Sequence, residues 1–222
     1  MIDGIRFKVC GLTALVDAEF ADRCGADYLG FILYPKSPRC ISLAQYESMA
    51  RRLPQRRKVA VSVEPSIIEL GAMIAAGFDF FQVHFSSQTP FATIREWSEL
   101  VTPERLWLAP KLPLGTDVPG SLVPLAKYFL LDAFHADAYG GTGQPGDWPK
   151  FARHRLAHPS KTWILAGGLN DENIGEALRA SGARFVDVNS GVESAPGVKD
   201  HAKLKRFVVR LHESREHGAV GS

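Results

Sequence analysis

Two side chains suited to proton transfer, Cys10 and Asp132, stand at the ends of short apolar runs. Cys10 follows RFKV and Asp132 follows YFLL. A thiol and a carboxyl group that face one pocket can act as general base and general acid, once burial and neighbouring charges bring their pKa values toward neutrality. Lys8 and Lys111 would favour a thiolate at Cys10 if their side chains point inward. A cysteine in an apolar run is also a common buried structural residue, so both interpretations stay open.

A second set of residues is suited to holding a phosphate. Gly167-Gly168 and Ser190-Gly191 follow the last two apolar runs, and their small side chains let backbone N–H groups turn toward an anion. A short helix beginning near Gly191 would add the positive end of its dipole. The alternative is that these glycines only form turns, but two such loops after the last two runs favour phosphate.

Arg39 lies in the segment YPKSPR, which two prolines stiffen, and a guanidinium held there suits the two oxygens of a carboxylate. The alternative is a solvated loop arginine. Gln82 and His84 alternate near the end of another apolar run, where they face the pocket or serve as structural polar groups. We expect no metal, because no cluster of His, Cys and Asp has the spacing of a zinc site.

Eight apolar runs, separated by helix-like segments, predict the strands that must position these residues. Several runs are apolar at consecutive positions, which is typical of parallel strands covered on both faces. The predicted strands are 6–10, 28–33, 58–63, 78–84, 105–111, 128–132, 162–166 and 184–188. Helices are predicted at 13–24, 42–53, 66–76, 171–181 and 200–214, with Thr13, Ser42, Ser66 and Asn170 as starting residues.

This alternation predicts an α/β fold, a single (β/α)8 TIM barrel with an eight-stranded parallel sheet, over residues 1–222. Three prolines within 112–127 predict that the fifth helix is short or missing. The tail 213–222 is expected to be frayed. A doubly wound open sheet is the alternative, but the G-x-G-x-x-G fingerprint is absent after the first strand. In a TIM barrel the active site lies at the C-terminal ends of the strands.

Composition narrows the class of protein. The chain has 222 residues, 26 Lys and Arg against 24 Asp and Glu, and 45% hydrophobic residues. This balance gives no basic stripe for a nucleic-acid partner. Three cysteines without a CxxC pair, no apolar run long enough to span a bilayer and no secretory signal favour a cytoplasmic protein, without a membrane partner. We expect a small-molecule ligand and a monomer or homodimer.

The same residues occur in blocks that resemble the phosphoribosylanthranilate isomerase family of tryptophan biosynthesis. The blocks follow the family's order and span nearly the whole chain. They are KVCGLT (8–13), GADYLGFILYPKSPRCIS (25–42), FDFFQVH (78–84), LLDAFHADAYGGTGQPGDW (130–148), AGGLNDENI (166–174) and VDVNSGVESAPGVKD (186–200). The resemblance implies a (β/α)8 barrel that converts N-(5-phosphoribosyl)anthranilate to a 1-deoxyribulose isomer by an Amadori rearrangement, without a cofactor.

The resemblance also implies roles for particular residues. Cys10 corresponds to the family's general base, Asp132 to its general acid, and Arg39 to its clamp on the anthranilate carboxylate. Its substrate-binding residues correspond to the phosphate-binding Gly167, Gly168, Ser190 and Gly191, to Gly141, which closes over the site, and to Gln82, His84 and Asp187.

Three positions depart from the family pattern. Phe85 replaces a usual glycine and is expected to crowd the mouth, Pro110 lies inside the fifth strand, and Asn189 replaces a usual serine beside the phosphate loop. Two other functions stay as alternatives: a histidine-pathway phosphoribosyl isomerase, which would normally carry aspartate where Cys10 stands, and a non-catalytic phosphosugar-binding barrel.

Overall fold

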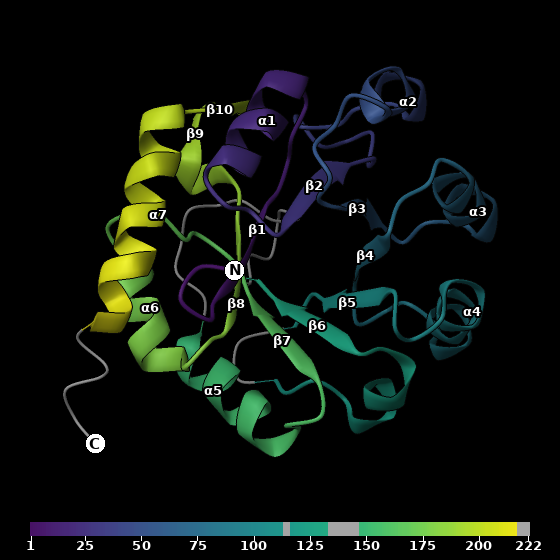
Figure 1. Ribbon diagram of the computed structural model, residues 1–222. Helices are drawn as coiled ribbons and strands as arrows, with labels where there is room; N and C mark the ends of the chain where they lie inside the picture. Colours follow the sequence, from purple (N-terminus) through teal and green to yellow (C-terminus); the bar gives the residue numbers. More distant parts are fainter. Residues whose placement is uncertain (113–115, 133–146, 217–222) are drawn as a thin grey trace.

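The computed structural model describes residues 1–112, 116–132 and 147–216. Eight parallel strands close into a barrel in chain order, and Figure 1 shows this ring of strands surrounded by helices. Every strand lies within two residues of its predicted bounds, so the fold predicted from the sequence is confirmed. The strands are β1 (Arg6–Val9), β2 (Tyr28–Ile32), β3 (Arg57–Val63), β4 (Phe80–Phe85), β5 (Leu106–Pro110), β6 (Tyr128–Leu131), β7 (Thr162–Leu165) and β8 (Phe185–Val188).

Of the five helices predicted by residue range, four are shorter at their ends in the structure, and the last one ends two residues later than predicted. The helices that cover the barrel are α1 (Leu15–Arg23), α2 (Leu43–Ala50), α3 (Ile67–Ala75), α4 (Phe91–Val101), α5 (Trp148–Ala157), α6 (Ile174–Ser181) and α7 (His201–Glu216). In the described part of the fifth crossover, 111–112 and 116–127, the one helix is the 3-10 helix η1 (Gly120–Leu125), with Pro124 inside it, as the prolines predicted. None of the described helices is long and apolar enough to cross a membrane.

Two of the four predicted helix starts are confirmed. Ser42 and Ser66 each form a capping box with the third residue of the helix. Thr13 is not a cap: its hydroxyl donates instead to the carbonyl of Gly197, 2.6 Å away, and joins two loops at the barrel rim. Asn170 is not a cap either, because α6 begins at Ile174 and Asn173 occupies the cap position.

α7 ends at Glu216, two residues beyond the predicted helix 200–214, and 217–222 lie outside the described residues. The frayed tail over 213–222 stays a prediction. Between β8 and α7 the structure adds elements that the sequence did not predict. These are a 3-10 turn, η2 (Ser190–Val192), and a two-stranded hairpin of β9 (Glu193–Ala195) and β10 (Val198–Lys199).

Aromatic rings close the barrel interior at its N-terminal end. Tyr28, Phe80, Tyr128 and Phe185, one from each even-numbered strand, form a layer in which Tyr28 packs on Phe80 and Phe185, and Phe80 on Tyr128. Trp107 of β5 packs against all four rings. The ligand site is therefore confined to the opposite end of the barrel.

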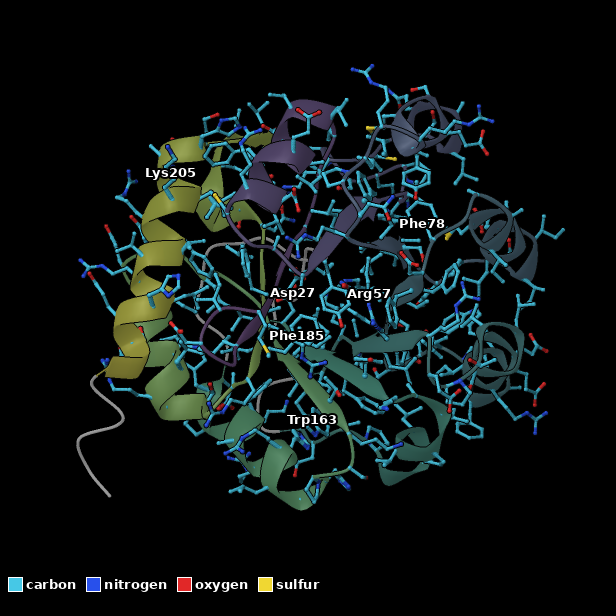
Figure 2. The ribbon with its side chains drawn as sticks, in the orientation of Figure 1. Asp27, Arg57, Phe78, Trp163, Phe185 and Lys205 are labelled. Atoms are coloured by element: carbon cyan, nitrogen blue, oxygen red, sulfur yellow. The ribbon has the colours of Figure 1, made fainter. Side chains whose placement is uncertain are left out.

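A second apolar layer lies between the strands and the helices. Figure 2 places Phe185 near the middle of the barrel, and Phe78 and Trp163 outside the ring of strands. Trp163 stacks on His154 of α5 with centroids 5.1 Å apart. Phe85 belongs to this outer layer: it is 3% exposed and packs against Trp97 of α4. The expectation that Phe85 crowds the mouth was wrong, because alternation along β4 turns it away from the interior.

Candidate active site

A cavity opens at the C-terminal ends of the strands, with about 740 Å³ of empty space up to the solvent. Nine of the residues predicted from the sequence line it: Cys10, Arg39, Gln82, His84, Asp132, Gly167, Gly168, Asp187 and Ser190. Gly191 lies just behind the lining, packed so closely on the carbonyl of Leu169 that a Cβ atom would have no room. Gly141 lies outside the described residues.

Cys10 reaches the cavity because it continues the alternation of β1. Lys8 and Cys10 share the inward face of this strand, and the N–H of Cys10 donates to the carbonyl of Val188 at 2.9 Å. The Cys10 residue is only 4% exposed, and what remains exposed faces the cavity. The thiol is therefore held at the floor of the site by the sheet itself.

Beneath Cys10 lies a fully buried ion pair. Lys8 Nζ donates to Asp187 Oδ2 at 2.9 Å and to Gln82 Oε1 at 2.8 Å, and the lysine side chain has no exposed surface. Gly30 of β2 makes this possible, since a Cβ atom there would lie 2.6 Å from Lys8 Cε. A charge this deep is tolerated only with such partners.

One oxygen of this pair is left unused. Asp187 is 7% exposed and lines the cavity, and its Oδ1 has no hydrogen-bond partner among the described residues. Burial raises the pKa of Asp187, and the neighbouring charge of Lys8 opposes that rise. A buried, unsatisfied acceptor beside a cavity is a position where a ligand hydroxyl group can donate.

Lys8 of this ion pair also sets the protonation state of His84. Because Lys8 can only donate, Gln82 must turn its Oε1 to Lys8 and its Nε2 to His84 Nε2, which lies 2.8 Å away. The ring therefore accepts at Nε2 and carries its proton on Nδ1. Burial and the charge of Lys8 lower the pKa of His84 to about 4, so it is neutral at pH 7.

The structure corrects the expected ionisation of Cys10. Lys8 does point inward and lowers the pKa of the thiol, but burial and the carboxylate of Asp187 outweigh it and raise that pKa above the ordinary value. Lys111, the other lysine expected to favour a thiolate, is not among the described residues that line the cavity. Cys10 is therefore a neutral thiol at pH 7, because burial and the carboxylate of Asp187 outweigh the charge of Lys8.

Asp132 faces the same cavity from the other side of the barrel. It follows β6 directly, is half-buried and lines the cavity together with Cys10. Strand β6 stands far from β1 around the ring, as Figure 1 shows, so the carboxyl and the thiol approach a ligand from different directions. Two groups placed in this way can give and take protons at different atoms of one molecule.

The loops after β7 and β8 form a wall rich in backbone amides. Gly167 and Gly168 have positive φ angles of 90° and 64°, and their N–H groups donate to no acceptor among the described residues. The predicted helix near Gly191 is only the three-residue turn η2, beginning at Ser190. The N–H groups of the glycine turns, rather than a helix dipole, are thus the features suited to an anion.

Arg39 is held by a residue that the sequence analysis missed. Its Nε lies 3.0 Å from both Oε1 and Oε2 of Glu193, and its Nη2 lies 2.7 Å from Oε2. Lys199 Nζ also donates to Glu193, at 2.9 Å. The only signal in the sequence is that two charged residues flank the turn SAPGV, which becomes the hairpin β9–β10. No three His, Cys, Asp or Glu side chains gather as a metal site in residues 1–112, 116–132 and 147–216.

Comparisons with known proteins agree on one family. A family model described as N-(5'phosphoribosyl)anthranilate (PRA) isomerase matches residues 7–210. An N-(5'-phosphoribosyl)anthranilate isomerase of Neisseria gonorrhoeae (strain ATCC 700825 / FA 1090) is 35% identical over 207 residues, which is 92% of this chain and 95% of the relative. The enzyme of that name from Cereibacter sphaeroides (strain ATCC 17029 / ATH 2.4.9) is 38% identical, with 92% and 97% of the two chains covered.

Solved structures agree as well. Phosphoribosyl anthranilate isomerase from Thermus thermophilus superposes with a TM-score of 0.76 at 32% identity, covering 94% of this chain and 99% of its own. Another phosphoribosyl anthranilate isomerase, in complex with reduced 1-(o-carboxyphenylamino)-1-deoxyribulose 5-phosphate, matches at 29% identity and a TM-score of 0.73, with 94% and 99% covered. A structure of monomers derived from a dimeric Thermotoga maritima enzyme matches at 30% identity and a TM-score of 0.72, with 93% and 97% covered.

Proposed function

Because the chain belongs to the N-(5'-phosphoribosyl)anthranilate isomerase family, we propose that Cys10 and Asp132 carry out the proton transfers of that family's reaction. The protein is an isomerase of tryptophan biosynthesis. It catalyses the Amadori rearrangement of N-(5-phosphoribosyl)anthranilate to 1-(o-carboxyphenylamino)-1-deoxyribulose 5-phosphate. The observation that supports the two roles is that the Cys10 thiol and the Asp132 carboxyl group line a single cavity from the ends of separate strands.

The reaction assigns a step to each group. Asp132 gives a proton to the furanose ring oxygen, the C1′–O bond breaks, and the nitrogen lone pair forms a protonated Schiff base. Cys10 then removes the proton from C2′ as a thiolate, and the electrons of that C–H bond form the enolamine. Tautomerisation of the enolamine gives the ketone. No redox partner is needed, since hydrogen only moves within the substrate.

The remaining predicted residues bind the substrate. We assign the phosphate to the amides of Gly167 and Gly168 together with Ser190 and Gly191, because these loops line or back one wall of the cavity. Arg39, which also lines the cavity, takes the anthranilate carboxylate. Its Nη1 and the outer N–H of Nη2 remain beyond the edge that Glu193 occupies.

The ribose of the substrate lies over the buried residues Lys8, Gln82 and Asp187. Asp187 Oδ1 accepts from a ribose hydroxyl, because it is a buried acceptor without a partner in the described residues. His84 and Gln82 border the same space and orient the sugar between the acid and the base. Gly141 stays a predicted contact from outside the described residues.

Asp132→Asn tests the acid. The amide keeps the shape of the side chain but cannot deliver a proton, so kcat and kcat/KM should both fall by about 10²–10⁴-fold. Binding of reduced 1-(o-carboxyphenylamino)-1-deoxyribulose 5-phosphate needs no proton transfer and should stay close to wild type. If that binding falls as far as kcat does, Asp132 is a binding group and the acid is another residue.

Cys10→Ser tests the base in the same assay. A hydroxyl group is a far weaker base than a thiolate, so turnover should fall by about 10²–10⁴-fold while the far-UV circular dichroism spectrum is unchanged. Near wild-type turnover would remove Cys10 from the mechanism. A lost spectrum would show a mainly structural thiol.

We also propose a cytoplasmic enzyme that is a monomer or a homodimer. The support is a biosynthetic family and a related structure described as derived from a dimer. Light scattering coupled to gel filtration distinguishes the two states.

A further inference from the structure

The hairpin β9–β10 brings a buried lysine to the rim of the cavity, where the proposed reaction has no evident use for it. Lys199, at the end of β10, has no exposed side-chain surface, and its carboxylate partner Glu193 is 4% exposed. Figure 1 shows the hairpin beside α1 and α7, at the edge of the barrel. Burying an ammonium group is costly without full compensation, so its partners indicate its role.

The partners of Lys199 leave its head group no donor for a ligand. Nζ donates to Glu193 Oε1 at 2.9 Å, to Asn189 Oδ1 at 2.9 Å and to the Asn189 carbonyl at 3.4 Å. An ammonium group has three protons, and three acceptors surround it here. By hydrogen bonding, Lys199 therefore reaches a ligand only through a neighbouring residue.

That neighbour is Glu193, which in turn holds Arg39. Without Lys199 the carboxylate of Glu193 would neutralise the guanidinium that it binds, and a second carboxylate would meet no net positive charge. With Lys199 present the three groups Arg39, Glu193 and Lys199 carry a net charge of one positive unit, because two cations flank one anion. The free edge of Arg39 therefore keeps its attraction for an anion.

Asn189 connects this group to the cavity wall. It accepts from Lys199 through Oδ1 and directly precedes Ser190. Gly11 leaves the space for this arrangement, since a Cβ atom there would lie 2.5 Å from Asn189 Oδ1 and 3.0 Å from Arg39 Cδ. The asparagine and the arginine thus pack over the same glycine.

We propose that Lys199, held by Asn189, is a positioning residue that sets the preference for a carboxylated substrate by fixing and neutralising Glu193 behind Arg39. This inference rests on the proposed role of Arg39 as the carboxylate clamp. The hairpin β9–β10 thereby takes part in selecting the substrate. It acts through Arg39, which Glu193 holds, and not by direct contact.

A pair of ligands separates this role from a structural one. The first is reduced 1-(o-carboxyphenylamino)-1-deoxyribulose 5-phosphate, and the second is the same molecule without its carboxyl group. Lys199→Met should weaken the first by about tenfold and leave the second within about twofold. Equal loss for both ligands, or no loss for either, would overturn the proposal.

Lys203→Met is the matched control. Lys203 Nζ donates to the backbone carbonyl of Glu193 at 2.8 Å. The same substitution there removes a cation that also binds Glu193, but leaves the contacts of the Glu193 carboxylate unchanged. It should leave the ratio of the two affinities within about twofold of wild type. A control that shifts this ratio as far as Lys199→Met would overturn the proposal too, because any nearby cation would then serve.

Arg39→Met tells the two hypotheses apart. If it weakens both ligands equally, the carboxylate clamp of the proposed function is wrong. If it weakens only the carboxylated ligand while Lys199→Met does not, the clamp stands and the inference about Lys199 fails. In the Arg39→Met background, Lys199→Met should cause no further selective loss.

Asn189→Ala keeps the test decisive if Lys199→Met does not fold. It removes one acceptor from Lys199 but leaves the charge, so it should weaken the carboxylated ligand selectively by about threefold. A loss shared by both ligands, or no selective loss, would contradict the positioning role.

Discussion

Two buried groups of charges lie at the open end of the barrel, and they differ in whether their acceptors are satisfied. Inside the barrel Asp187 gives one oxygen to Lys8 and keeps the other without a partner among the described residues. At the rim both oxygens of Glu193 are bonded, by Arg39 and Lys199. The inner group therefore offers an acceptor to a ligand, whereas the rim group offers donors.

The difference follows from where each group is anchored. Lys8 and Asp187 sit on paired strands, where the register Lys8↔Asp187 sets their distance and no loop can move to complete the bonding. Arg39 lies in a loop and Glu193 in the short hairpin strand β9, 154 residues apart along the chain and outside the barrel sheet, where the segments can adjust until each oxygen has a partner. Barrel strands thus hold an unsatisfied group in place for binding, and the rim segments build a complete scaffold behind a donor.

Among the variants that test this comparison, Lys8→Met should have the largest effect. It leaves Asp187 buried without its cation, and breaking a buried pair in this way costs about 3–5 kcal/mol of unfolding free energy. Lys199→Met should cost less, about 1–3 kcal/mol, because Arg39 still pairs with Glu193. Urea unfolding followed by circular dichroism measures both values. Equal losses would show that the inner and rim groups are equivalent.

Asp187→Asn tests the inner group through the pH at which Cys10 ionises. Because burial and the charge of Asp187 raise the pKa of Cys10, alkylation of the Cys10 thiol should keep accelerating with pH up to and beyond the ordinary thiol value of 9.0. Removing the negative charge should move that rise to lower pH. Mass spectrometry of the Cys10 peptide after iodoacetamide treatment across pH measures the shift, and identical profiles would remove Asp187 as a control on the thiol.

Glu193→Gln tests the rim through stability. Burial alone would raise the pKa of Glu193, but hydrogen bonds and charges from Arg39 and Lys199 outweigh it and lower that pKa below 4.5. A lowered pKa in the folded state stabilises the protein above the unfolded value, and that stability is lost as pH falls through the folded one. The variant should therefore be about 1 kcal/mol less stable at neutral pH, with the difference closing in acid. A difference that stays constant from neutral to acid pH would contradict the ionised pair.

Phe85→Leu should have the smallest effect on activity and serves as a control for both groups. Phe85 follows His84 directly but packs outward on Trp97. The variant should keep kcat and KM within about twofold, while losing about 1 kcal/mol of stability from the outer layer. A clear fall in KM would revive the interpretation in which Phe85 crowds the cavity.

Most of the site could be predicted because the strands could. Apolar runs mark where each strand ends, and in a barrel of parallel strands those ends meet at one mouth. Cys10 and Asp132 were found by that rule, and the family blocks indicate their roles. The outward side of Phe85 could have been predicted from alternation along β4. The expectation that it crowds the mouth came instead from comparing it with the family's glycine.

The groups that were missed share a cause. Glu193 and Lys199 gain their meaning from Arg39, which is 154 residues from Glu193 along the chain. Nothing in the segment SGVESAPGVKD indicates that Glu193 and Lys199 turn inward rather than toward solvent. Contacts of this range come from the packing of loops at the rim, which local patterns do not encode.

The order of apolar and polar residues was enough to define the eight-stranded barrel, the end that carries the site, and the chemical types available there. Backbone periodicity and turn residues are local properties, so the sequence carries them directly. Tertiary structure alone decided that Lys8 is committed to Asp187, that Cys10 is consequently a neutral thiol, and that Arg39 is held by Glu193. Ionisation and orientation depend on burial and on charges brought together across the fold, and these exist only once the barrel has closed.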